Sequence, residues 1–164
     1  MKFLMSMKDK ENSKKLILIS NRKASRNYVI IEKFEAGLVL TGSEVKSIKL
    51  KHASIQEGYV QIDKKLEAWL INCSVQPYIS STTTSHNVDR EKKLLLKRNE
   101  IEKLNSRVKE KGFSIIPLNY YLLKGKIKIE IALCQGKDLF DKREAIKKRE
   151  SQRNIKRLIK NYNN

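Results

Sequence analysis

The clearest structural pattern in this sequence is a pair of apolar runs, FSIIPLNYYLL (113–123) and KIKIEIALC (126–134), on either side of Lys124-Gly125. Successive side chains of a β-strand point to opposite faces, and the second run alternates apolar with charged residues in this way. Both runs are therefore predicted to be strands, and Pro117 indicates an edge or a bulge position in the first. The apolar face of the second strand would consist of Ile127, Ile129, Ile131 and Leu133.

Shorter strands are predicted nearer the N-terminus. The run LILIS (16–20) favours a strand or an apolar peg, and residues 28–40 favour a strand with a bend or bulge at Gly37. Between them, residues 21–27 form a basic connector that we expect to be exposed. Apolar residues alternate on both sides of a turn at Asp63–Lys65, which predicts a hairpin that Pro77 ends.

Two helices are predicted between these strands. Ser43 is a candidate N-cap for a helix of about one to two turns in SEVKSIKLK (43–51). Asp89 is a candidate cap for a longer helix that Gly112 would end, because the apolar residues between them fall on one helical stripe. This stripe consists of Leu94, Ile101, Leu104 and Val108.

The order of these elements predicts the fold class. Several short antiparallel strands with a buried helix, and no regular alternation of strand and helix, indicate a small, partly closed β-barrel. Barrels of this kind often bind oligonucleotides on their outer face. We expect residues 1–15 to form a flexible N-terminal extension, residues 16–136 the barrel, and residues 137–164 a separate basic tail.

The charge of the chain points to a polyanionic partner. The sequence has 36 Lys and Arg residues against 18 Asp and Glu residues, which gives a formal net charge of +18. Solubility alone does not require so large a charge, so nucleic acid is the first partner to consider. Nucleotide bias is an alternative source of the lysines, since 27 of the basic residues are Lys, but it explains the deficit of acids less well.

Other function classes find little support in the sequence. Cys73 and Cys134 are too few and too far apart for a zinc knuckle or a disulfide framework, which favours two buried thiols in a reducing compartment. No apolar run has the length of a signal peptide core or a membrane span, so we expect a cytoplasmic protein without a membrane partner. Because no catalytic triad, metalloprotease motif or glycine-rich phosphate loop occurs, we expect neither catalysis nor a cofactor.

The last segment, Lys137–Asn164, carries ten Lys or Arg residues against four Asp or Glu residues. Ile146 stands alone, and only a thin stripe between Ile155 and Tyr162 could pack against a core. Because so little apolar surface cannot offset the entropy of ordering the chain, we expect the tail to be disordered in the free protein. It should become helical on a phosphate-rich surface, where Lys and Arg contacts release counterions.

Five separate stretches of the sequence resemble one known family. They are NRKASRNYVIIEKFEAGLVLTGSEVKSIK, ASIQEGYV, KLLLKRNEIEKL, KEKGFSIIPLNYY and GKDLFDKRE, in this order between about Asn21 and Glu150. Together they resemble small protein B, the family of bacterial proteins that bind transfer-messenger RNA. The resemblance implies a mainly β fold with helices, namely an OB-like antiparallel β-barrel with about three helices.

The resemblance also implies a function, which is that of an adaptor without catalytic chemistry. Members of the small protein B family bind the tRNA-like domain of transfer-messenger RNA. With elongation factor Tu and GTP, they deliver this RNA to ribosomes that have stalled on an mRNA without downstream message. There the basic tail becomes helical in the empty mRNA path, next to ribosomal RNA of the small subunit, and trans-translation tags the incomplete chain.

Particular residues of this sequence match the RNA-binding positions of the family. They are Asn21, Arg22, Lys23, Glu35, Leu95 in KLLL and Lys128, to which Arg26 is added for its charge. The basic residues would neutralise phosphates, whereas Glu35 must accept hydrogen bonds from a base, a 2′-hydroxyl or an arginine. Alternatively, Glu35 forms a surface ion pair that only positions Arg22 or Lys23. A helix here would bury one or two of the three leucines and leave another to face RNA.

For the ribosomal site, the resemblance implies a set of tail residues. They are Gly136, Lys137, Asp141, Lys142, Arg143, Lys147, Lys148 and Arg149. Asp138 stands where the family commonly has a lysine, which should weaken non-specific phosphate binding slightly. Around His86 the sequence also departs from the family pattern, with Asn87 and Val88, and a solvated histidine is the simpler interpretation there and at His52.

Two further functions remain as alternatives. A general binder of single-stranded nucleic acid should carry a row of aromatic residues on its strands, and the aromatic residues of this chain form no such row. Trp69 could still offer a stacking face, or it could pack against the core or a loop. A nuclease that uses Glu35 and His86 is the third possibility, and it would cleave RNA in the presence of Mg²⁺.

Overall fold

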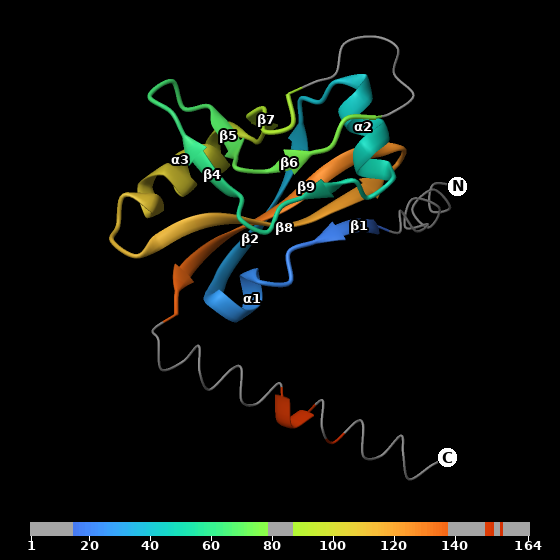
Figure 1. Ribbon diagram of the computed structural model, residues 1–164. Coiled ribbons are helices and arrows are strands. Elements are labelled where there is room, and N and C mark those ends of the chain that lie inside the picture. The colour runs from blue at the N-terminus through green and yellow to red at the C-terminus, as the bar shows by residue number, and fades with distance from the viewer. Residues whose placement is uncertain (1–14, 79–86, 138–149, 153–154, 156–164) are drawn as a thin grey trace, which may run out of the picture.

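The structure of the chain is a computed structural model that describes residues 15–78, 87–137, 150–152 and 155 (Figure 1). Residues 150–152 and 155 are helical. The other tail residues beyond 137, residues 1–14 and the loop at 79–86 lie outside the described residues. The predictions that the N-terminal extension is flexible and that the free tail is disordered therefore stay predictions.

Nine strands and three helices follow one another between residues 15 and 137, outside the undescribed loop. The strands are β1 (Leu16–Ser20), β2 (Tyr28–Leu38), β3 (Ala53–Ser54), β4 (Tyr59–Ile62), β5 (Ala68–Ile71), β6 (Ser74–Val75), β7 (Lys92–Leu95), β8 (Phe113–Leu123) and β9 (Lys126–Gly136). The helices are α1 (Ala24–Asn27), α2 (Gly42–Lys49) and α3 (Arg98–Val108). The predicted mainly β fold with about three helices is thus confirmed.

The long strands β8 and β9 organise the sheet. Strand β8 pairs with β9, β9 with β2, β2 with β7, β7 with β5, β5 with β4, and β4 pairs back with β8, all antiparallel. These pairings close six strands into a ring, while β1 adds to β8 and the short β3 and β6 form a separate pair. The ring has the closure expected of a small barrel.

The strongest strand pattern of the sequence is confirmed in β9. Its four alternate apolar residues are at most 8% exposed, and β9 pairs with β8 across the turn at Lys124-Gly125. The register of this pair shifts between Pro117 and Asn119, so the proline lies at a bulge. This bulge accommodates a residue that cannot donate a backbone hydrogen bond to a regular ladder.

The core fills the interior of the ring. Ile48 of α2, Leu104 of α3 and Tyr120 of β8 are fully buried there, in one cluster with the inward residues of the strands. Because a buried aliphatic side chain stabilises the fold by about 1.5–3 kcal/mol, such contacts fix both helices on the sheet. Cys73 and Cys134 are buried and free, as expected, and burial raises the pKa of the Cys73 thiol to about 12.

The helix predicted after Asp89 is wrong in its first half. Residues Lys92–Leu95 form strand β7, and helix α3 begins only at Arg98. Leu94 pairs with Ala68 on one side and with Leu38 on the other, so the sheet takes up this segment. The spacing of Leu94 from Ile101 matched a helical stripe by coincidence, because Leu94 alternates with exposed Leu95 in a strand.

Two local predictions in the N-terminal half are also corrected. The N-cap of α2 is Thr41 rather than Ser43, since the Glu44 amide donates to the Thr41 hydroxyl at 3.4 Å and the Glu44 carboxylate accepts from the Thr41 amide at 2.8 Å. The irregularity in the pairing of β2 lies between Ile30 and Glu32 rather than at Gly37. Gly37 pairs in regular register with both Leu95 and Lys128.

Candidate nucleic-acid interface

Charged residues alternate along the outer faces of β2 and β9. Glu35 lies directly opposite Glu130, a pairing of like charges that would by itself destabilise the sheet. Each carboxylate is compensated separately. Glu35 is 2.5 Å from the Nζ of Lys128 and 3.0 Å from that of Lys15. Glu130 is 3.7 Å from the Nζ of Lys33 and accepts a hydrogen bond from Asn119 at 2.9 Å.

The lysine contacts fix the ionisation state of Glu35. The hydrogen bond from Lys128, with smaller contributions from Tyr121 and Lys15, lowers the pKa of Glu35 to about 2. The carboxylate is therefore ionised at neutral pH and can only accept hydrogen bonds from a partner. The alternative that Glu35 positions Arg22 or Lys23 is wrong, because its ion-pair partners are Lys128 and Lys15.

Leu95 lies next to these charges. Its side chain is 54% exposed and packs against Gly37, where an added Cβ would lie 3.3 Å from the Leu95 Cβ. Leu94 is buried, so strand alternation in β7 exposes Leu95, and Leu96, which follows the strand, is half-buried. A shallow depression of about 370 Å³ at this place is lined by Gly37, Leu38, Leu40, Val45, Leu95, Gly125, Lys126, Ile127 and Lys128.

The structure thus brings together three of the residues that the family resemblance selected: Glu35, Leu95 and Lys128. We call this area the hairpin surface, after the hairpin of β8 and β9 at its edge. It consists of Lys15, Glu35, Leu95, Lys126 and Lys128. It combines ammonium groups, an ionised carboxylate and an exposed apolar side chain. Such a surface can contact phosphates, 2′-hydroxyl groups and base or sugar edges of RNA.

The basic connector is organised around Asn21, which was expected to be exposed and is only 6% exposed. Its Nδ2 donates to the carbonyl groups of Ile55 and Pro117, and its Oδ1 accepts from the amides of Lys23 and Ala24. All the hydrogen-bonding groups of this side chain are therefore occupied within the protein. Asn21 anchors the connector to the ring and is not available to RNA.

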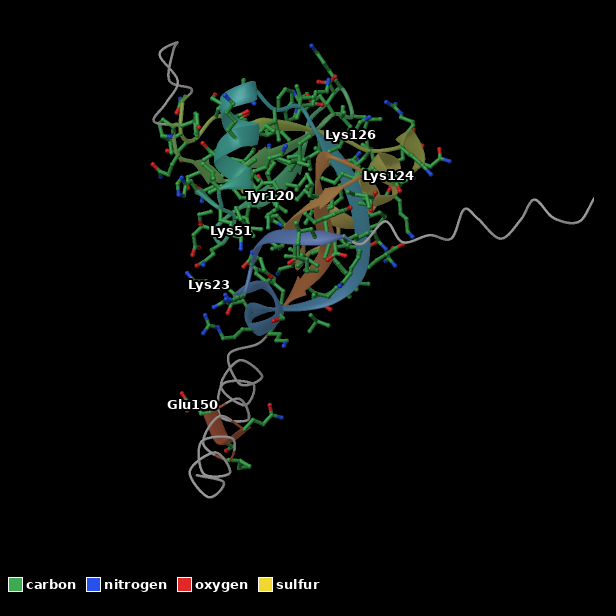
Figure 2. All side chains as sticks on the ribbon, turned by 90° about the vertical axis from the view of Figure 1, so that its right-hand side faces the viewer. Lys23, Lys51, Tyr120, Lys124, Lys126 and Glu150 are labelled. Carbon is green, nitrogen blue, oxygen red and sulfur yellow. The ribbon has the colours of Figure 1, made fainter. Side chains whose placement is uncertain are left out.

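The other predicted residues of the connector point outward. Arg22 is exposed, Arg26 lies in the last turn of α1, and the Nζ of Lys23 is 2.5 Å from Glu57 in an exposed ion pair. Figure 2 shows Lys23 and the hairpin residues Lys124 and Lys126 at opposite ends of the ring. The connector and the hairpin surface are therefore two separate basic areas.

The basic tail leaves the ring beside α1. The amide of Gly136 donates to Gly112, and Lys137 donates to Asn27 through its amide and to Ser25 through its Nζ, at 3.1 Å in both cases. Gly136 and Lys137 are thereby tied to the ring. The remaining predicted tail residues, Asp141, Lys142, Arg143, Lys147, Lys148 and Arg149, lie outside the described residues, as does the departure at Asp138.

Sequence reasoning missed Lys15, which had been assigned to the flexible extension. It pairs with Glu35, and its ammonium group lies 4.8 Å from the ring centre of Tyr121. The pairing of β1 with β8 places Ile17 opposite Tyr121 and so brings the start of β1 to this surface. No local signal marks this contact, because it depends on two strands about a hundred residues apart.

A buried charged cluster was also missed. Glu44 and Lys92 are fully buried, and Arg90 donates to both carboxylate oxygens of Glu44. Burial alone would raise the pKa of Glu44, but Arg90 and the Thr41 amide lower it below its usual value. Lys92 donates to the carbonyl groups of Cys73 and Arg90, so this cluster anchors α2 to the segment that leads into β7.

The remaining candidate residues take no part in the hairpin surface. Trp69 is half-buried, donates from Nε1 to Asp63 at 3.3 Å, and has the Nζ of Lys93 at 5.8 Å from its ring centre. His52 is exposed, and His86 lies outside the described residues. At the departure from the family pattern, Asn87 accepts a hydrogen bond from the Asp89 amide, and the Val88 carbonyl accepts one from Val75.

Neither a metal site nor a membrane-spanning helix is present in the described part of the chain. No group of three or more His, Cys, Asp or Glu side chains there could hold a metal ion. None of the described helices has both the length and the apolar character that crossing a membrane requires.

Comparison with known proteins identifies the family. The family model described as SmpB protein matches residues 18–161. The chain belongs to this family. It is 45% identical over 147 residues to the SsrA-binding protein of Streptococcus agalactiae serotype III, covering 90% of this chain and 94% of that protein. The SsrA-binding protein of Trichormus variabilis is 46% identical over 95% of this chain and its own full length.

A solved structure has the same fold. It carries the description "tmRNA-SmpB: a journey to the center of the bacterial ribosome" and superposes with a TM-score of 0.63. The two chains are 31% identical, over 78% of this chain and 93% of the other. The SmpB family is the small protein B family that the sequence motifs resemble, so the recognition made from those motifs is confirmed.

Proposed function

We propose that this chain binds transfer-messenger RNA and delivers it to stalled ribosomes for trans-translation. The names of its relatives support this function, since they are SsrA-binding proteins and one solved relative is described with transfer-messenger RNA and the ribosome. The observation that carries the proposal is the grouping of Glu35, Leu95 and Lys128 on one surface. These residues come from three different strands, β2, β7 and β9.

The lysines, the carboxylate and the leucine of the hairpin surface have different tasks in this function. Lys128, Lys126 and Lys15 neutralise phosphates of the tRNA-like domain. The ionised Glu35 accepts a hydrogen bond from a 2′-hydroxyl or a base amine, and it holds Lys15 and Lys128 side by side until RNA arrives. Leu95 contacts the apolar edge of a base or a sugar in the depression beside Gly37.

The connector adds contacts to transfer-messenger RNA, and the tail acts on the ribosome. Arg22, Lys23 and Arg26 supply further phosphate contacts from the connector, and Asn21 keeps the connector in place from within. Residues Asp141, Lys142 and Arg143, followed by Lys147, Lys148 and Arg149, contact ribosomal RNA of the small subunit in the empty mRNA channel. The complex that arrives there also contains elongation factor Tu and GTP, and the process takes place in the cytoplasm.

In this function the chain is an adaptor rather than an enzyme. Its two thiols are buried, and Glu35 is paired with lysines rather than held ready as a base. Its work is therefore binding and placement of RNA. A nuclease role for Glu35 would require a carboxylate that is free to take up a proton or hold a metal ion.

A comparison of three RNAs tests the proposal. Transfer-messenger RNA, a tRNA and a single-stranded RNA of equal length are titrated against the purified chain in gel-shift experiments at one salt concentration. We expect the tightest binding to transfer-messenger RNA and no cleavage of any RNA with Mg²⁺. Equal affinity for all three RNAs would contradict the proposal and favour a general nucleic-acid binder.

A further inference from the structure

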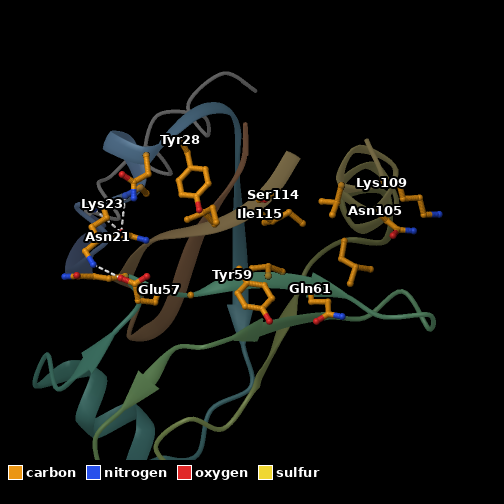
Figure 3. A pocket seen from close by; sticks show the side chains of 18 residues that line it. Asn21, Lys23, Tyr28, Glu57, Tyr59, Gln61, Asn105, Lys109, Ser114 and Ile115 are labelled. Carbon is orange, nitrogen blue, oxygen red and sulfur yellow. Dashed lines mark hydrogen bonds and ion pairs between the residues drawn. The ribbon is translucent and has the colours of Figure 1, made fainter. Parts of the chain in front are cut away.

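A second hollow shares no residue with the hairpin surface. It lies between the connector, β4 and α3, with a volume of about 700 Å³ (Figure 3). This volume is within the range of sites that bind small molecules. Strands β4 and β8 contribute Val60, Ile115 and Ile116 to its lining, and the proposed function uses none of these three residues. Lys23 of the connector also lines the hollow and is shared with the proposed function.

Two aromatic rings take part in the lining of this hollow. Tyr59 of β4 is 43% exposed, although it is a large side chain next to the core. Tyr28 at the start of β2 is half-buried and enters from another side, and Figure 3 shows the two rings across the hollow from each other. An exposed aromatic face in a hollow is a stacking platform for a nucleic-acid base.

Polar groups suited to a base edge stand beside these rings. The side-chain amides of Asn105 on α3 and Gln61 on β4 line the hollow, and neither has a hydrogen-bond partner among the described residues. An amide offers both donors and an acceptor, as the edge of a base does. Asn105 is half-buried at the hollow, so its amide remains within reach of a ligand.

Lysines at two places on the rim complete a nucleotide site. Lys109 follows α3 at one end of the hollow, and Lys23 lies at the other end. Lys23 forms an ion pair with Glu57 in which both side chains are exposed. An exposed ion pair contributes little to stability, so a phosphate can replace Glu57 as the partner of Lys23. An acidic peptide would also attract these lysines, but it would not use the tyrosine rings or the amides.

We propose that this hollow binds one unstacked nucleotide of single-stranded RNA. The base stacks on Tyr59, its edge pairs with Asn105 or Gln61, and its phosphate contacts Lys23 or Lys109. The site is separate from the hairpin surface and does not depend on transfer-messenger RNA as the ligand there. It gives the protein a means to hold a base that has left a helical stack.

Binding of a short RNA to variants of the full chain tests this site. Fluorescein-labelled hexa-adenylate is titrated at low salt and followed by fluorescence anisotropy, with folding checked by circular dichroism. Tyr59→Ala should weaken binding about tenfold, because stacking on one aromatic ring is lost, whereas Tyr59→Phe should retain it. The matched control is Tyr78→Ala, which removes a ring outside the hollow and should have a much smaller effect.

Cross-linking of the unaltered chain gives a result that needs no variant. A hexanucleotide with one 4-thiouridine is irradiated with the protein, and the modified peptides are identified by mass spectrometry. We expect the cross-link at Tyr28, Tyr59 or Asn105. The proposal is overturned if cross-links occur only elsewhere, if Tyr59→Ala and Tyr78→Ala weaken binding equally, or if hexaglutamate displaces the RNA as well as unlabelled hexa-adenylate does. None of these outcomes bears on the hairpin surface, which the three-RNA comparison tests separately.

Discussion

The ammonium group of Lys128 on β9 and the carboxylate of Glu35 on β2 lie 2.5 Å apart, one strand pairing away from exposed Leu95 on β7. This contact explains how an acidic residue belongs in a basic RNA-binding area. Glu35 separates two lysines that would otherwise repel each other, and it remains ionised and able to accept hydrogen bonds. Acid and base are parts of one surface rather than competing features.

The first prediction concerns the pH dependence of stability. Because the folded-state pKa of Glu35 is about 2, below its usual value of 4.5, the ionised carboxylate stabilises the fold above pH 4.5, and this contribution is lost as the pH falls toward 2. Glu35→Gln removes it. The free energy of unfolding, measured with urea, should differ between the two proteins at pH 6 and converge near pH 2. A difference that stays constant over this range would show that the lysine contacts do not stabilise the ionised form.

The second prediction concerns the close packing around Gly58. A Cβ at this position would lie 2.2 Å from the Cys73 sulfur and 3.2 Å from Pro117. Gly58→Ala should therefore destabilise the protein by about 1–3 kcal/mol, measured by urea denaturation. Adding Cys73→Ala should recover part of the loss, because it removes the nearest atom. If Cys73→Ala adds its own full cost instead, the two sites do not contact each other.

The third prediction concerns the buried cluster around Glu44. Glu44→Ala leaves Arg90 and buried Lys92 without their carboxylate, which should cost about 3–5 kcal/mol of unfolding free energy. Lys92→Met should cost less, since Glu44 keeps its contacts with Arg90 and Thr41. The matched control is Arg98→Ala, which breaks an exposed pair with Glu102 and should cost about 0.5 kcal/mol or less. Similar losses for all three variants would mean that burial does not matter here.

The fourth prediction separates the ring from the tail. Truncation after Lys137 keeps the hydrogen bonds of Lys137 to Ser25 and Asn27, so the ring should fold and bind transfer-messenger RNA as the full chain does. Tagging of stalled chains should be lost, because the tail residues proposed for the mRNA channel are gone. Gel shifts and a reconstituted tagging reaction measure the two effects. Loss of most RNA affinity on truncation would contradict this division of tasks.

The sequence predicts those elements whose pattern is strictly local. The alternation in β9, the turn at Lys124-Gly125 and the hairpin of β4 and β5 all appear as expected. The helix predicted after Asp89 fails only in its first half, because a strand and a helix can share the same short apolar spacing. For Leu94, the pairing of its strand with β2 and β5 decides between the two. Tertiary contacts overrule local pattern there.

The candidate site was also predictable only in part, because tertiary contacts bring its residues together. Glu35, Leu95 and Lys128 followed from family motifs, and the ring explains why residues so far apart in the sequence meet. Lys15 could not be found, because its place depends on the pairing of β1 with β8. Asn21 carries a motif position but is buried as an anchor, a role that no pattern of charge reveals.

The central claim is that the hairpin surface binds the RNA, and the salt dependence of transfer-messenger RNA affinity tests it most directly. Each phosphate contact contributes about one unit to the slope of log affinity against log salt concentration. Lys128→Ala should lower affinity and reduce this slope by about one unit. Glu35→Gln should lower affinity and leave the slope almost unchanged, since a carboxylate makes no phosphate contact. Affinity and slope that are the same in Lys128→Ala as in the unaltered protein would contradict the claim.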